Sequence, residues 1–90
     1  MIDAEATVDD ILAALARAKD LLKRNRDWDL FKALAEATTS VVCGKPSYRI
    51  YAEARNAILP PAELARFVET QPRLVWIAAI DKTIKTLRGD

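Results

Sequence analysis

Apolar side chains recur every three or four positions along most of this chain, the spacing that places them on one face of an α-helix. In the first such segment, Thr7 precedes the apolar pattern and Asp10 follows three residues later, a short form of the capping box that marks a helix start. Basic residues up to Arg26 suit the negative end of the helix dipole. The expected apolar stripe consists of Val8, Ile11, Leu12, Leu15, Ala18 and Leu22.

Four further helices are predicted between chain-breaking residues. They cover residues 27–42, 48–59, 61–70 and 72–88. Gly44 and Pro46 end the second helix, Ser47 caps the third, and Pro60 and Pro61 separate the third from the fourth. The faces expected to point inward are Phe31, Leu34, Ala35, Thr38, Val41 and Val42 in the second helix, Ile50, Tyr51, Ala54, Ala57 and Ile58 in the third, Leu64, Phe67 and Val68 in the fourth, and Trp76, Ile77, Ile80, Ile84 and Leu87 in the fifth.

The last predicted helix contains the segment LVWIAAI at 74–80, which is apolar on nearly every side. A helix of this kind is expected to be buried on more than one side. Together the five patterns predict an all-α fold, a compact bundle of four to five short helices with mostly antiparallel neighbours. The 90 residues are expected to form a single helical-bundle domain over 1–90, with 1–6 as a frayed N-terminus.

Composition supports this fold and narrows the chemistry. Sixteen alanines favour helices that approach closely, and only two glycines disfavour a β-rich fold with many tight turns. The net charge is +1, which by itself indicates neither a nucleic-acid binder nor an acid-seeking surface. The absence of histidine and the single cysteine leave no zinc ligand set and no internal disulfide. We therefore expect a reduced, cytoplasmic protein. The acidic N-terminal sequence predicts no signal peptide, and the longest apolar run, seven residues at 74–80, is too short to span a membrane.

The stretch NRDWDLFKALAE at 25–36 has oxygen-bearing side chains in the order of an EF-hand calcium loop. Asn25, Asp27 and Asp29 would supply early ligands, and Glu36 the last one. However, Leu30 stands where that loop needs glycine, and Lys32 stands where it needs an apolar anchor. We therefore interpret the stretch as a helix start, with Asn25 or Asp27 as the cap and Asp29 in the first turn, and expect no metal.

Two other features resemble catalytic sites without completing one. Cys43 lies beside Lys45, but no histidine is present to activate it, and the end of a helix disfavours a thiolate. The acidic pair Asp9 and Asp10 is explained by the positive end of a helix dipole, as are Asp27 and Asp29. We expect no catalytic residue, no cofactor and no enzymatic activity.

Basic residues gather at the ends of the first and last helices, namely Lys19, Lys23, Arg24 and Arg26, and Lys82, Lys85 and Arg88. If the bundle brought these ends together, they would form a local positive patch for phosphate or an acidic partner. A nucleic-acid accessory protein is therefore the alternative function. The same residues are also explained by the preference of cations for helix C-termini, and acidic neighbours such as Asp20 and Asp81 would weaken the patch.

Apolar residues outside the stripes point to a protein interface. Tyr48 and Leu59 lie off the stripe of the third helix, and Leu74 and Val75 off that of the fifth. We expect a small regulator, adaptor or inhibitor that binds another protein, or itself as an isologous dimer, through a helical face. The residues expected to bind the partner are Tyr48, Leu74, Val75 and Trp76, with Lys82 and Lys85 as a charged rim. Whether Trp76 belongs to the core or to the interface is left open by the sequence.

Overall fold

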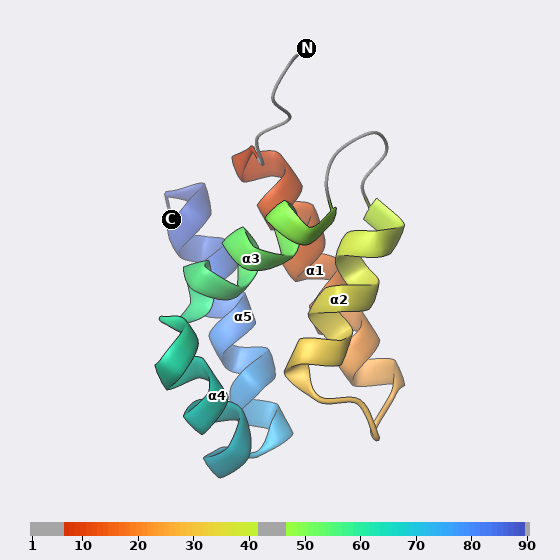
Figure 1. Ribbon diagram of the computed structural model, residues 1–90, viewed down its shortest axis with the longest axis vertical. Helices are drawn as coiled ribbons and strands as arrows, with labels where there is room; N and C mark the ends of the chain where they lie inside the picture. Colours follow the sequence, from red (N-terminus) through yellow and green to blue (C-terminus); the bar gives the residue numbers. More distant parts are fainter. Residues whose placement is uncertain (1–6, 42–46, 90) are drawn as a thin grey trace.

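The computed structural model describes residues 7–41 and 47–89, apart from the side chains of residues 40, 41 and 47, and these ranges contain five α-helices. Figure 1 shows how the helices pack together. The helices are α1 (Val8–Arg24), α2 (Leu30–Val41), α3 (Ser47–Ile58), α4 (Pro61–Thr70) and α5 (Arg73–Arg88). No strand occurs within the described ranges, and the predicted all-α bundle is confirmed. The expectations for residues 1–6, Val42, Cys43, Gly44, Pro46 and the Ser47 cap, and for the Val41 side chain, lie outside what is described.

The ends of α1 and α4 follow the sequence signals closely. Thr7 Oγ1 accepts a hydrogen bond from Asp10 N at 3.2 Å, and Thr7 N donates to Asp10 Oδ2 at 3.1 Å, which completes the predicted capping box. α4 begins at Pro61, directly after Pro60, because a proline at the first helical position needs no hydrogen bond from its nitrogen. Both helices therefore start where local chemistry alone places them.

The start of α2 differs from the prediction. The helix begins at Leu30 rather than near residue 27, because Asp29 is its cap: Asp29 Oδ1 accepts from Lys32 N at 2.8 Å. Asn25 instead closes α1, where its Nδ2 donates to Leu21 O at 3.0 Å. The cap was therefore placed wrongly at Asn25 or Asp27, and residues 25–29 form the connection between the two helices.

α1 is the central helix of the bundle. It packs against α2, α3 and α5, whereas α4 packs chiefly on α3. α1 and α5 run in opposite directions, so the C-terminal end of α1 and the first turn of α5 lie at the same end of the molecule (Figure 1). Buried alanines on α1 and α2 let these two helices approach closely. They are Ala14, Ala18, Ala33 and Ala37.

The core confirms most of the predicted stripes and corrects three of them. In α1 the buried face includes Ala14, while Val8 is 51% exposed. In α2 the buried face is turned toward Leu30 and Ala33, and leaves Ala35 exposed. In α3, Ala57 was expected to point inward and is exposed. The core consists of Ile11, Ala14, Leu15, Ala18, Leu22, Leu30, Ala33, Leu34, Ala37, Ile50, Ala54, Leu64 and Ile80.

α5 contradicts the expectation that its first two turns are buried on more than one side. Only Ile80 and Thr83 are buried along the whole helix. Trp76, Ile77, Ile84 and Leu87 are half-buried on the predicted stripe, and Leu74 and Val75 are exposed. The reason is position: α5 packs on α1 and α3, and neither of these covers the other sides of its first turn.

Candidate interaction surface

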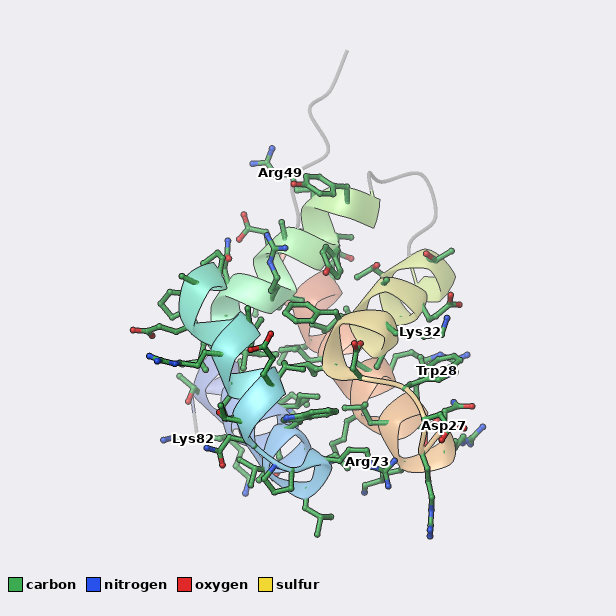
Figure 2. The ribbon with its side chains drawn as sticks, turned by 60° about the horizontal axis from the view of Figure 1, so that its bottom comes forward. Asp27, Trp28, Lys32, Arg49, Arg73 and Lys82 are labelled. Atoms are coloured by element: carbon green, nitrogen blue, oxygen red, sulfur yellow. The ribbon has the colours of Figure 1, made fainter. Side chains whose placement is uncertain are left out.

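The first turn of α5 carries the most exposed apolar side chains of this helix. Leu74 is 76% exposed and Val75 is 37% exposed. The turn is anchored on one side, where the Arg73 guanidinium donates to the backbone carbonyl of Leu22 near the end of α1 (Figure 2). Arg73 points toward α1, and Leu74 and Val75, which follow at steps of about 100° around the helix axis, lie on the outside of the bundle.

Trp76 lies against the core rather than beside these exposed residues. Its ring is half-buried and packs on the core. Its indole Nε1 is buried and has no hydrogen-bond acceptor in the described part of the chain. Buried tryptophan nitrogens usually find an acceptor, so the position of this ring is set mainly by apolar packing.

Val75 belongs to a longer row of residues on α5. Val75, Ala79, Lys82 and Thr86 follow one another at steps of four, three and four residues, which places them on a single helical face. We call this row the outer stripe of α5. The stripe lies about 100° away from Leu74 around the helix axis, and it faces away from Ile80 and Ile84 on the core side.

Three residues of the outer stripe line a groove of about 280 Å³ between the end of α3, α4 and α5. We call it the α3–α4–α5 groove. Its apolar lining consists of Ala57, Ile58, Leu59, Phe67 and Ala79. Its polar lining consists of Lys82, Thr83 and Thr86. None of the described residues that line the groove is acidic. No local sequence pattern indicates the groove, because its walls come from three helices.

The polar side chains of the groove differ in whether their hydrogen-bond donors remain free to bind a ligand. Thr83 Oγ1 donates to Ala79 O at 2.8 Å, and Thr86 Oγ1 donates to Lys82 O at 3.0 Å, so both hydroxyl protons are used within α5. Lys82 is exposed and has no ion-pair partner among the described residues. The groove therefore offers an apolar floor and one uncompensated positive charge.

Lys85, the other predicted rim residue, is engaged within the chain. Asp81 pairs with Lys19 of α1 at 3.0 Å and with Lys85 at 3.5 Å. The hydrogen bond from the Lys19 ammonium and its charge, with a smaller contribution from Lys85, lower the pKa of the Asp81 carboxyl below its ordinary value. This cluster links α1 to α5. It also holds Lys19 at the edge of the apolar stripe of α1, where a long side chain can cover apolar surface while its charge stays near solvent.

Tyr48 is exposed but distant from the first turn of α5. It is 74% exposed and lies in the first turn of α3, which is near the opposite end of the long axis from the start of α5 (Figure 1). It lines a separate hollow of about 260 Å³ with Ala35, Thr38, Thr39 and Tyr51. The predicted partner-binding residues therefore do not form one continuous surface. On α5, Leu74, Val75, Lys82 and Lys85 are exposed, and of the two lysines only Lys85 is paired with a described carboxylate, that of Asp81.

The two basic clusters are kept apart. The C-terminal ends of α1 and α5 lie at opposite ends of the molecule, because the two helices are antiparallel (Figure 1). Lys19 and Lys85 are paired with Asp81, and Arg24 is paired with Asp20 at 3.2 Å. Whether the bundle joins these helix ends into one patch was left open by the sequence. The ends lie apart, so the condition on which the nucleic-acid alternative depended is not met by this arrangement.

Trp28 is a half-buried aromatic residue whose role was not predicted from the sequence. The Lys32 ammonium lies 4.9 Å from the centre of its ring, and Figure 2 shows the pair on the opposite side of the molecule from Lys82. Trp28 is half-buried and is not among the side chains packed on the core. The sequence feature that could have indicated this residue is a tryptophan between two aspartates, with no apolar residue three or four positions before it.

Within the described ranges, histidine, cysteine, aspartate and glutamate form no group of three or more that would suit a metal ion. None of the helices in those ranges combines the length and the apolar content of a bilayer-spanning segment. Comparison of the chain with protein families, with curated proteins and with solved structures found no match.

Proposed function

We propose that this chain is a non-enzymatic interaction protein, a regulator, adaptor or inhibitor, that binds a protein partner through the outer side of α5. The observation that supports the proposal is the exposure of Leu74 and Val75 in a helix whose opposite face is used for packing. Large apolar side chains on the surface lose contact with water when a partner covers them, and each contributes to association in proportion to the area removed from water.

Isolated surface leucines and valines are common in proteins, so neighbouring features matter. Val75 continues into the outer stripe, whose other members line the apolar α3–α4–α5 groove. The exposed first turn and the groove thus lie along the same helix. This continuity distinguishes the α5 surface from Tyr48, whose hollow is bordered by α2 and α3.

The proposal is tested by placing a photoreactive benzoylphenylalanine at position 74 in cells and irradiating them. A partner seated on the first turn of α5 is then joined covalently to the protein, and the mass of the adduct tells whether it is another protein or a second copy. The same amino acid at Glu53, an exposed polar position on α3, serves as the matched control.

We expect a defined adduct from position 74 and only background from position 53. An adduct with the mass of two chains indicates the self-association version of the proposal, and sedimentation over a range of concentrations then gives the dimer constant. Equal, diffuse labelling from the two positions contradicts the proposed function.

A further inference from the structure

We infer that the α3–α4–α5 groove and the outer stripe of α5 bind an acidic amphipathic α-helix of the partner protein. The inference rests on the proposed function and names the chemistry of the partner. Its three parts are that the partner segment is apolar on one face, that it is helical, and that it carries carboxylates beside the apolar face. Each part follows from a different observation.

The apolar face of the partner follows from the lining and size of the groove. Five of the eight lining residues are apolar. The volume of about 280 Å³ is slightly below the range of roughly 300–1,000 Å³ that is typical of small-molecule sites. The groove is also open to solvent along α5, where Lys82 and Thr86 are exposed. A row of large side chains inserted from outside fits such a groove better than an enclosed small molecule.

The helical form of the partner follows from the backbone of the site. The walls of the groove are helices, whose backbone groups are hydrogen-bonded within the helices themselves, so an extended peptide would find no edge to pair with. A helix brings its own backbone hydrogen bonds. From Val75 to Thr86 the outer stripe is roughly 16 Å long at 1.5 Å per residue, which matches about three turns of a partner helix with anchors at i, i+4 and i+7.

The acidic character of the partner follows from Lys82. Among the described residues it is the only charged one that lines the groove, and no described carboxylate neutralises it. The two threonine hydroxyls are already donating to carbonyls of α5, so the lysine is the main donor left for a ligand. A carboxylate next to the apolar anchors would complement this charge, and a lysine or arginine in that place would be repelled by it.

The test uses a displayed library of 18-residue helical peptides with leucine at i, i+4, i+7 and i+11 and with randomised flanking positions. Peptides are selected against the wild-type protein, against Lys82→Glu, and against Lys23→Glu. Lys23 is an exposed lysine of α1 without an ion-pair partner among the described residues, so the control changes the net charge equally at a place outside the groove. Thr86→Phe, which fills the groove from an exposed position, is the second variant.

We expect the peptides selected against wild type and against Lys23→Glu to be enriched in aspartate and glutamate. Those selected against Lys82→Glu should be enriched in lysine and arginine. For the best acidic peptide, fluorescence anisotropy should show a loss of about tenfold in affinity with Lys82→Glu, and a similar loss with Thr86→Phe. Circular dichroism of each variant checks that the bundle is folded.

The inference is overturned if the selected peptides show no charge preference, or the same one with Lys82 and with Glu at that position. A second contrary result is displacement of the peptide by a low concentration of sodium laurate that itself binds in a Lys82-dependent way, since this assigns the groove to an acyl chain. A third is dissociation of a homodimer by Lys82→Glu, since this assigns the groove to a second copy of the chain. A light-dependent adduct from position 74 together with any of these results leaves the proposed function intact. Charge-selective peptide binding without such an adduct contradicts the proposed function alone.

Discussion

α1 and α5 are alike in length and in their basic last turns, yet the bundle uses them differently. α1 has 17 residues, of which five are buried along one stripe, and α5 has 16 residues, of which two are buried. The first turns of α5 are the more apolar by sequence. Burial in this protein is therefore decided by how many neighbours a helix has and less by how apolar it is.

The neighbours explain the difference. α1 packs on α2, α3 and α5, and its apolar stripe is covered from Ile11 to Leu22. α5 packs mainly on α1 and α3, and the same helix also borders the α3–α4–α5 groove. An apolar helix at the side of a bundle has more apolar surface than its own chain can cover, which makes that surface available to a partner.

The largest expected effect comes from breaking the central helix. Leu15→Ala removes a fully buried side chain of α1 and should lower the free energy of unfolding by about 4 kcal/mol, since it leaves a cavity among closely packed helices. Leu74→Ala on α5 should change it by less than about 0.5 kcal/mol. Urea denaturation of the two variants measures both. Equal losses would mean that the two helices are covered to the same extent.

The next effect distinguishes Trp76 from Leu74, two residues earlier on α5. Trp76→Ala should lower the free energy of unfolding by about 3 kcal/mol, at the low end for tryptophan because the ring is half-buried. Thermal and chemical unfolding, followed by circular dichroism, provide the measurement. A change as small as that of Leu74→Ala would show that the ring contributes little to the core and is free to contact a partner.

A smaller effect is expected at the helix starts. Thr7→Ala removes the hydroxyl that accepts from Asp10 N and should cost about 1 kcal/mol of stability. Thr7→Ser, which keeps the hydroxyl, is the matched control and should cost clearly less. α5 begins after Pro72 without a side-chain cap, so Pro72→Ala should not lower the stability through the loss of a capping hydrogen bond. If Thr7→Ala were neutral, the capping box would not be a determinant of where α1 begins.

The smallest effect tests the contact between the two helices through pH. Because the pKa of Asp81 is lowered in the folded protein, mainly by its hydrogen bond with Lys19, the carboxylate contributes stability above the pKa of an unfolded aspartate, about 3.9. This contribution is lost as the pH falls through the lower pKa of the folded state. The melting temperature of wild type should therefore exceed that of Asp81→Asn at pH 7, and the difference should disappear in acid.

The side chains of this ion-pair cluster are partly exposed, so salt should also reduce the difference. Melting curves at pH 7 with and without roughly 0.5 M NaCl provide the control. A difference that grew toward low pH would contradict the assigned direction of the pKa change.

Much of the fold followed from local signals that need no tertiary information. Thr7 with Asp10, and Pro60 with Pro61, fix their helix starts through hydrogen bonds and backbone restriction within a few residues. The error at α2 arose because Asn25, Asp27 and Asp29 are all good caps, and the sequence alone does not rank them. Its buried face was misplaced because Ala33 and Ala37 are weak hydrophobic signals, although they are fully buried.

The candidate site was predictable only in part. That Tyr48, Leu74 and Val75 lie off the main stripes could be seen in the sequence, and all three are exposed. Which of them share a surface depends on how the helices are arranged, and no local pattern contains that information. The α3–α4–α5 groove and the pairing of Lys19 with Asp81 join residues far apart in the chain, so they emerge only from the packed structure.

The pairing of α1 with α5 has a consequence for the newly made chain. Lys19 and Asp81 are separated by 62 positions, which a ribosome translates in roughly 3 to 12 s at 5–20 residues per second. During that interval the leucine-rich side of α1 has only its earlier neighbours to cover it. The face of α1 that α5 covers therefore stays open to chaperones and proteases until α5 has left the exit tunnel.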